Sequence, residues 1–376
     1  MTRTGRPRRS KVAALALGAC LLLAVAGCGS DAEGGDGKTL RYSSIIPDTT
    51  AAMQVNVDWA KRVQDASSGA LEVESFYAGS LIAAGDELQA LSGGRVDLAY
   101  FTPAYYPDQF PLWSIAGVPF VTADPEAQAL AFAEMYQNNA AFRAEFERNG
   151  IRPLYFLPTG PTVVGMTRPT TSLAELQGKR LRSVGLLAEA LRTVGVEPVA
   201  TGATEIYEAV ERGVLDGYSA ATFEIMAGYK LQEVAPYVLQ TDLGLFASAA
   251  TVISESTWGS LSPEQQAALQ SASETAIEDA VTKFATAEDG ACTALLDAGG
   301  SVTTLPASDV EEWRSRVGTG VADAWRKTAV AGGTDPATVD GFLRDFTAAV
   351  AKFEAGSGYT DGLARCAERS RGGASR

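Results

Sequence analysis

The sequence predicts an α/β fold of two lobes, followed by long helices. Between residues 39 and 157, stretches that alternate apolar and polar side chains are separated by stretches with apolar residues at helical spacing. The same order of strand and helix returns between residues 160 and 245, which indicates a second lobe. Strands that alternate with helices favour sheets in which most strands are parallel.

The first lobe is expected over residues 38–160. Its first helix is N-capped by Asp48 or Thr49, a short helix follows over 86–91, and a single long helix covers 125–149. Ser68-Gly69 and Gly93-Gly94 end the first two of these helices. The strands of this lobe are expected at 39–46, 70–76, 96–101 and 151–157.

The second lobe is expected over residues 161–250, and residues 251–366 are expected to form helices that return over the first lobe. Ser262-Pro263-Glu264-Gln265 is a capping box that begins a very long helix ending near Leu296. The remaining expected elements are strands at 163–168, 178–183 and 196–200, helices beginning near Ser172, Leu186 and Thr204, two helices near 308–329 and 336–354, and a frayed tail at 367–376.

The N-terminus carries the features of an export signal. A basic stretch over 1–11 precedes the apolar run 12–25, which is too short for a comfortable membrane span. The run leads into Val25-Ala26-Gly27-Cys28, which resembles a lipobox and makes Cys28 the predicted lipidated residue. An ordinary signal peptide with a chance cysteine is the alternative. Residues 28–37 would then be a flexible tether, with the protein anchored by lipid to the outer face of the cytoplasmic membrane.

The composition excludes several classes of function. The formal net charge is −14, and removal of the five basic residues within 1–27 leaves −19. No nucleic-acid partner is expected, because phosphate contacts need a basic face. The chain contains no histidine, which excludes Ser-His-Asp triads, Cys-His pairs and histidine-ligated zinc. Acidic pairs such as Asp86/Glu87 and Glu205/Glu208 leave a carboxylate-dependent hydrolase as an alternative. No cofactor or metal ion is expected.

Two cysteines remain after the N-terminal segment is set aside. They are Cys292 and Cys366, an even pair in a protein expected in an oxidising compartment. We expect a disulfide between them that ties the C-terminal region to the long helix. Two buried thiols are the alternative.

One arginine stands where the cleft of a two-lobed α/β fold would hold a ligand. In a strand over 179–182, Arg180 and Arg182 face the same side, and Arg182 ends the strand. Ligands of such folds lie at the carboxyl ends of strands. A guanidinium group matches a carboxylate with two parallel hydrogen bonds and keeps its charge, so Arg182 is a candidate anion clamp. A surface ion pair with Glu175 or Glu189 is the alternative.

An aromatic segment, YFTPAYYPDQFPLW at 100–113, follows the end of an expected strand. Such a loop fits the wall of a ligand pocket. It equally fits a small hydrophobic core beneath the loop, and we expect the aromatic residues to divide between the two roles.

Several segments in order resemble one known family, the extracytoplasmic solute-binding subunits of tripartite ATP-independent periplasmic (TRAP) transporters. These segments cover essentially the whole mature chain: SGALEVESFYAGSL (68–81), GGRVDLA (93–99), VPF (118–120), LAELQGKRLR (173–182), VGVEPVATGATEIYEAVERGVLDG (194–217) and WGSLSPEQQAAL (258–269). The resemblance implies a two-lobed, periplasmic-binding-protein-like (Venus flytrap) fold with a long bridging helix, closing on a small organic acid. The family's carboxylate-binding arginine falls on Arg182, and Arg180 matches a structural or surface lysine.

The departures from the family pattern predict a less polar and roomier pocket. Thr162 stands where many relatives have a second arginine, Ala220 replaces a usual asparagine, and Ala203 replaces a pocket aromatic residue. We therefore expect a monocarboxylate with an aromatic or apolar body. The candidate ligand-binding residues are Thr49, Phe101, Thr102, Tyr105, Tyr106, Arg182, Gly185, Ala220, Thr222 and Phe223.

The resemblance also implies partners. The closed, loaded form would dock on the small and large membrane subunits of a TRAP transporter, which would move the ligand with an ion gradient. A receptor that serves a sensor kinase and a receptor that serves an ATP-driven importer are the alternatives of the same binding class.

Overall fold

The first of two mixed β-sheets consists of strands from both ends of the chain. The computed structural model describes residues 37–373, which lie in one compact unit. The strand order of this sheet is β2-β1-β3-β10-β4. Strand β1 is parallel to β2 and β3, whereas β10 is antiparallel to β3 and β4. The strands are β1 (Lys38–Ser43), β2 (Leu71–Phe76), β3 (Leu98–Phe101), β4 (Ile151–Leu157) and β10 (Ala249–Ser254).

The second sheet has the order β11-β9-β5-β8-β6-β7. Here β5 is antiparallel to both of its neighbours, and the other pairs are parallel. The expectation of largely parallel sheets was therefore wrong at β10 and β5, each of which is antiparallel to both of its neighbours. The strands are β5 (Thr162–Met166), β6 (Arg180–Arg182), β7 (Glu197–Val199), β8 (Gly217–Thr222), β9 (Tyr237–Gln240) and β11 (Ser301–Thr304).

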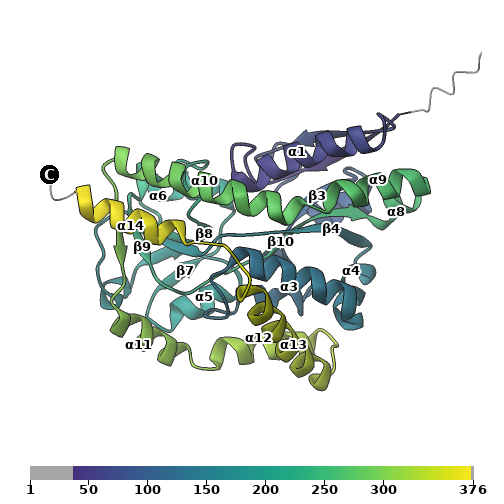
Figure 1. The fold of residues 1–376 in the computed structure, drawn as a ribbon. Helices are drawn as coiled ribbons and strands as arrows, with labels where there is room; N and C mark the ends of the chain where they lie inside the picture. The colour runs from purple at the N-terminus through teal and green to yellow at the C-terminus, as the bar shows by residue number, and fades with distance from the viewer. Residues whose placement is uncertain (1–36, 374–376) are drawn as a thin grey trace, which may run out of the picture. The chain divides into compact units, whose positions relative to one another are not determined.

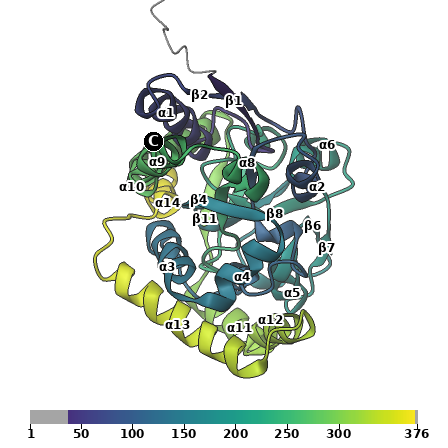
Figure 2. The same cartoon turned by 90° about the vertical axis from the view of Figure 1, so that its right-hand side faces the viewer.

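Helices cover both sheets. In Figures 1 and 2, α10 and α14 lie together on one side of the strands, while α11, α12 and α13 lie on the other. The short 3₁₀ helices are η1 (Pro103–Tyr105), η2 (Trp113–Gly117), η3 (Leu173–Leu176) and η4 (Ala203–Glu205). The α-helices are α1 (Ala51–Ala66), α2 (Glu87–Ser92), α3 (Pro125–Asn138), α4 (Ala140–Arg148), α5 (Gly185–Arg192), α6 (Ile206–Glu211), α7 (Leu231–Val234), α8 (Glu255–Gly259), α9 (Pro263–Ser273), α10 (Ala276–Asp297), α11 (Ala307–Val317), α12 (Gly320–Ala331), α13 (Pro336–Glu354) and α14 (Gly362–Gly373).

Helix α10 bridges the two lobes. Its first turns contribute Ala276 and Ala280 to the hydrophobic core beside α1 and β1, and its last turns contribute Ala291 and Leu295 to the core beside β8 and β9. The disulfide between Cys292 and Cys366 joins α10 to α14, with the Cα atoms 5.5 Å apart. One helix thus shares its apolar face between two cores, which sets the two sheets relative to one another.

Two helices that the sequence predicts as single are each broken in two. Between α3 and α4, Asn139 adopts an extended conformation and its side chain accepts a hydrogen bond from the amide of Phe142, so it caps the second helix. Between α9 and α10, the hydroxyl of Ser273 donates to the carbonyl of Leu269, a contact that bends helices. Local side-chain capping and hydrogen bonding therefore interrupt an otherwise continuous helical pattern.

The start of the first helix and the C-terminal helices differ from the prediction in smaller ways. The N-cap of α1 is Thr50, whose hydroxyl accepts from the amide of Met53, and neither Asp48 nor Thr49. Helix α14 continues to Gly373, so residues 367–373 are helical and not frayed. Helix α13 packs on α3 in the first lobe, but α14 packs on α10 and β11. The expected signal peptide, Cys28 and most of the tether lie outside the described residues, and the lobe boundaries stay a prediction.

Between residues 37 and 373, no helix combines the length and the hydrophobicity that a membrane span requires.

Candidate functional site

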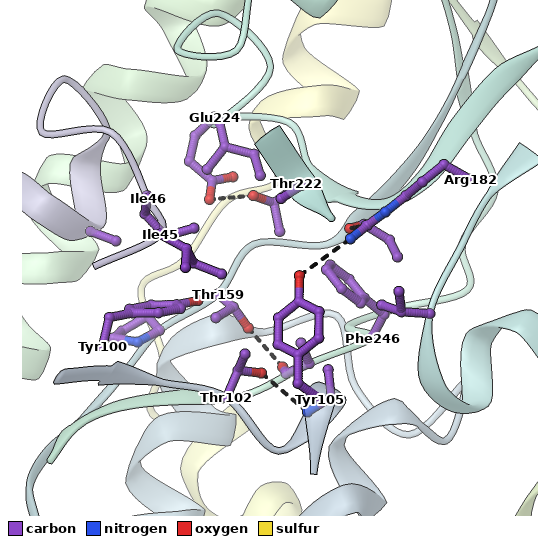
Figure 3. A pocket seen from close by; sticks show the side chains of 18 of the residues that line it. Ile45, Ile46, Tyr100, Thr102, Tyr105, Thr159, Arg182, Thr222, Glu224 and Phe246 are labelled. Atoms are coloured by element: carbon purple, nitrogen blue, oxygen red, sulfur yellow. Dashed lines mark hydrogen bonds between the residues drawn. The ribbon is translucent and has the colours of Figure 1, made fainter. Parts of the chain in front are cut away.

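A cavity lies where the two lobes meet. The space that it encloses, together with the open solvent at its mouth, is about 680 Å³. All three connections between the sheets line it: Thr159 follows β4, Phe246 and Ala247 precede β10, and Phe284 belongs to α10. The hydroxyl of Thr159 donates to the carbonyl of Ala247 over 2.7 Å, so the first two of these connections are linked at the base of the cavity (Figure 3).

Arg182 lies at the carboxyl end of β6 and faces this cavity. Backbone carbonyls of its own lobe hold the guanidinium: Nε donates to Thr201 over 3.1 Å, and Nη1 donates to Ala220 over 2.5 Å and to Ser219 over 3.4 Å. The remaining nitrogen, Nη2, makes one long contact of 3.5 Å with the hydroxyl of Tyr105. The side chain is therefore fixed with Nη2 available to a ligand.

The charge of Arg182 is buried without a counter-charge. The residue is 2% exposed, and no carboxylate between residues 37 and 373 forms an ion pair with it. Burial lowers its pKa, and the neighbouring Tyr105 and Tyr229 act in the opposite direction. An uncompensated cation in a largely apolar cavity is costly, and an anionic ligand would remove that cost.

The surface alternative for Arg182 does not hold in the structure. Glu189 pairs with Arg192, and Glu175 accepts a hydrogen bond from the amide of Thr171. The neighbouring Arg180, on the same face of β6, instead forms a half-exposed ion pair with Asp216. Arg180 and Arg182 lie on the same face of β6, so alternation does not explain their difference. Their positions along the strand place Arg180 in a surface ion pair and Arg182 in the cavity.

Four more of the sequence-predicted residues line the cavity with Arg182. Thr102 and Tyr105 come from the loop after β3, where the hydroxyl of Thr102 accepts from the amide of Ala104 and so begins η1. Figure 3 shows the hydroxyl of Tyr105 pointing toward Arg182. Ala220 and Thr222 come from β8.

The other sequence-predicted residues lie elsewhere. Phe101 and Tyr106 stack on each other, with ring centroids 4.8 Å apart, inside the core of the first lobe. Phe223 is buried in the core of the second lobe, because consecutive residues at the end of β8 point to opposite sides. Gly185 begins α5 and lines a neighbouring cavity, and Thr49 is exposed. None of these five lines the cavity that contains Arg182.

The aromatic segment divides as expected between wall and core. Tyr100 and Tyr105 line the cavity. Phe101, Phe110 and Trp113 pack into an aromatic cluster with rings of α3, α4 and β4. The cluster is fully buried, so it fixes the position of the loop that carries the two tyrosines.

Several lining residues have no place in the sequence prediction. They are mostly apolar, such as Ile45, Ile46 and Phe284, and their pattern does not differ from that of core residues. Two are polar: Thr159, and Glu224, which follows β8 in the apolar stretch ATFEIMAG. The sequence could have pointed to Glu224, because an acidic residue inside an apolar stretch is unusual.

In the acidic pairs that could serve a hydrolase, Glu87, Glu205 and Glu208 have structural partners. Glu87 accepts hydrogen bonds from the hydroxyl of Tyr106 and from the amide of Gly85. Glu205 accepts from the amide of Gly202, and Glu208 pairs with Arg212. None of these carboxylates lines the cavity.

Comparison with known proteins gives a consistent result. The model of the DctP family, bacterial extracellular solute-binding protein family 7, matches residues 42–328. A solute-binding protein of Roseobacter denitrificans, RD1_1052, is 26% identical over 275 residues, which cover 72% of this chain and 81% of the relative. The C4-dicarboxylate-binding periplasmic protein DctP of Rhodobacter capsulatus is 22% identical over 240 residues, covering 62% and 70%.

Two solved structures show the same fold. A TRAP periplasmic solute-binding protein from Bordetella bronchiseptica with bound (R)- and (S)-mandelate has a TM-score of 0.73 and 25% identity, covering 84% of this chain and 99% of its own. A TRAP solute-binding protein from Rhodoferax ferrireducens with copurified benzoate has a TM-score of 0.76 and 20% identity, covering 85% and 99%.

Proposed function

Because this chain belongs to family 7 of the bacterial extracellular solute-binding proteins, the TRAP receptors for small organic acids, we propose that its ligand is a monocarboxylate with an aromatic or apolar body. The family acts outside the cytoplasm and works with TRAP membrane subunits. The proposal concerns which acid this chain selects and how it holds that acid.

The buried, unpaired guanidinium of Arg182 is the observation that carries the proposal. It offers Nη2 to one carboxylate, and the cavity holds no second arginine or lysine among its lining residues. Thr162, at the position of a second arginine in many relatives, is buried and does not line the cavity. A dicarboxylate would leave one anionic group without a cation, at a large desolvation cost.

The rest of the lining favours an apolar body for the acid. Most of the wall is aliphatic or aromatic, including Ile45, Ile46, Val184, Phe246 and Phe284. The two structural relatives described above were solved with mandelate and benzoate, each an aromatic monocarboxylate. The Rhodobacter relative is named for C4-dicarboxylates, so the family by itself does not choose between these ligands.

The mechanism that we propose is closure of the two lobes on the bound acid. The crossing segments 158–161 and 241–248, together with α10, are the connections across which the lobes would move. Arg182 of the second lobe and Tyr105 of the first would then hold the same carboxylate, so ligand affinity and population of the closed form are linked. The closed form would dock on the membrane subunits, with Cys28 as the lipid anchor.

Calorimetry with a matched pair of variants tests this proposal. Arg182→Met should weaken binding of benzoate and phenylacetate by at least about 30-fold, because truncating one partner of a buried charge pair costs about 2 kcal/mol or more. Arg180→Met removes a nearby arginine that contacts only the surface ion pair and should bind these acids like the wild type. Equal affinities in the two variants, or binding of dicarboxylates alone, would contradict the proposal.

Native mass spectrometry of the purified protein would identify any acid that is retained from the host. A receptor for a sensor kinase or an ATP-driven importer is the second candidate. Neighbouring genes for one small and one large multi-span membrane protein would favour the TRAP partner, and their absence would favour the alternatives.

A further inference from the structure

A carboxyl group faces the cavity at a distance from Arg182. Glu224 lines the cavity, is 5% exposed, and accepts a hydrogen bond from the hydroxyl of Thr222 to Oε1 over 2.5 Å. Its other oxygen, Oε2, is buried and has no hydrogen-bond partner within the described part of the chain. A buried polar atom without a partner is uncommon in native proteins and needs an explanation.

No cation explains Glu224. It forms no ion pair with Arg182 or with any other basic residue between 37 and 373. Burial raises its pKa to about 7, although the hydroxyl of Thr222 and the nearby amides of Glu224 and Gly160 act in the opposite direction. The carboxyl group is therefore buried near a second buried acid, Glu288, with one oxygen unpartnered, which is a poor arrangement for stability alone.

The placement of Glu224 and Arg182 suits a ligand with two polar ends. In Figure 3, Thr222 lies between them, and the aliphatic side chains of Ile45 and Ile46 and the ring of Tyr100 lie along the cavity on the side of Glu224. Both polar residues are anchored to β8, Arg182 through the carbonyl of Ala220 and Glu224 through the hydroxyl of Thr222. One rigid strand thus sets the separation between the two groups.

We propose that Glu224 is a specificity residue that selects organic acids carrying a hydroxyl group remote from the carboxylate. The inference rests on the proposed function, in which Arg182 holds the carboxylate. It adds that the carboxyl group of Glu224, which lines the cavity, recognises the far end of the acid.

The chemistry of the group favours a hydroxyl over other substituents. A hydroxyl can donate to an ionised carboxylate and can also accept from a protonated one, so it fits Glu224 in both states. An ammonium group carries three donors, and the apolar side chains around Glu224 would leave some of them without acceptors. A ketone only accepts, so it fits the protonated state alone.

The test compares related acids on the wild-type protein. The probes are phenylacetate, its 2-, 3- and 4-hydroxy isomers, 3-(aminomethyl)phenylacetate and 3-acetylphenylacetate, measured by calorimetry. We expect at least one hydroxy isomer to bind about tenfold or more tightly than phenylacetate. Equal binding of phenylacetate and all hydroxy isomers, or tightest binding of the aminomethyl or acetyl compound, would overturn the inference.

Variants then locate the preference. In Glu224→Met, which keeps the length but removes the polar atoms, the ratio between the best hydroxy isomer and phenylacetate should fall below about threefold. Glu224→Gln keeps an acceptor and a donor and should retain part of the ratio. Glu211→Met, an exposed position on α6, is the control and should keep the full ratio. A full ratio in Glu224→Met would show that another group reads the hydroxyl and would overturn the assignment.

The measurements distinguish failure of the proposed monocarboxylate function from failure of the assignment of Glu224. If the wild type binds none of these acids, and Arg182→Met changes nothing, both proposals fall. If phenylacetate binds in an Arg182-dependent manner without any effect of the hydroxyl, only the assignment of Glu224 falls. Because the wild-type series alone can refute the inference, the test does not depend on how well Glu224→Met folds.

Discussion

Nη2 of Arg182 and the hydroxyl of Tyr105 lie 3.5 Å apart, and they belong to different lobes. The arginine ends β6 of the second sheet, and the tyrosine ends η1 after β3 of the first. In the proposed function a ligand carboxylate would be held from both sides at this contact, which would link capture of the ligand to closure.

Tyr105→Phe should weaken binding of a monocarboxylate by about three- to tenfold, as expected for loss of one hydrogen bond of ordinary strength. Burial raises the pKa of Tyr105, so its hydroxyl is protonated at neutral pH and can donate to a carboxylate. Calorimetry at pH 7 measures the effect. Tyr106→Phe is the matched control because that hydroxyl contacts Glu87 and not the cavity; equal effects of the two substitutions would refute the role of Tyr105.

Gly165→Ala should destabilise the second lobe. A Cβ atom at Gly165, in β5, would overlap the ring of Tyr218 on the neighbouring β8. Overpacking of this kind costs about 1–3 kcal/mol, which chemical denaturation can measure. Gly290→Ala is the counterpart: a Cβ atom there meets nothing within 4 Å, and alanine in the middle of α10 should add about 0.5–1 kcal/mol of stability. Destabilisation by both changes would contradict this reading of the packing.

Removal of the disulfide should lower stability without changing ligand specificity. Cys292 and Cys366 are 74 residues apart and both buried, and closing a loop of this length is worth about 2–5 kcal/mol. The double variant Cys292→Ala/Cys366→Ala should therefore unfold at lower urea concentration than the oxidised wild type. A reductant should lower the midpoint of the wild type and leave that of the variant unchanged. Insensitivity of the wild type to reductant would refute the prediction.

The stability of the protein should decrease as the pH rises from about 5 to about 8. Burial raises the pKa of Glu288 to about 8 and that of Glu145 to about 8, whereas unfolding returns both to values near 4.5. Between these values the folded protein binds more protons than the unfolded chain, so each such group lowers the free energy of unfolding by up to about 1.4 kcal/mol per pH unit. Below the pKa of the unfolded chain, near 4.5, Glu288 and Glu145 make their full contribution to the free energy of unfolding.

Glu288→Gln should make this pH dependence shallower. The amide oxygen can still accept from the hydroxyl of Tyr359, which donates to Oε1 of Glu288 over 2.8 Å, but the group no longer titrates. Urea denaturation at pH 5, 6, 7 and 8 gives the slope. Glu278→Gln, exposed on the same helix, controls for the loss of a carboxylate. Parallel profiles of Glu288→Gln and the wild type would count against the raised pKa of Glu288.

Much of the fold could be predicted because its signals are local. Alternation gave the strands up to β7 with small errors in their bounds, helical spacing missed the break between α3 and α4, and the capping box at Ser262 marks the start of α9 as expected. The insertion of β10 between β3 and β4 was not predicted, because its neighbours are more than ninety residues away in sequence. No local pattern carries the register or direction of such a pairing.

Some residues of the candidate site could likewise be predicted from local sequence, and others could not. Arg182 was predicted because a cation at the end of a strand is a local feature, and a resemblance of motifs pointed to the same residue. Phe101 and Tyr106 were placed in the pocket, but they belong to the core, because aromatic residues in a loop have the same composition in either role. Glu224 was missed although it is an acidic residue inside an apolar stretch, because only the structure shows that it lines the cavity and that its Oε2 lacks a partner.

By itself the sequence determined the succession of elements, the absence of histidine chemistry and the presence of one arginine at a cleft position, since each depends on residue type and spacing alone. Only the tertiary structure decided that Arg182 is buried without a counter-charge while Arg180, two residues earlier, pairs with Asp216 at the surface. The physical reason is that burial and hydrogen-bond partners come from segments far apart in the chain: the loop after β3, strand β8 and helix α10.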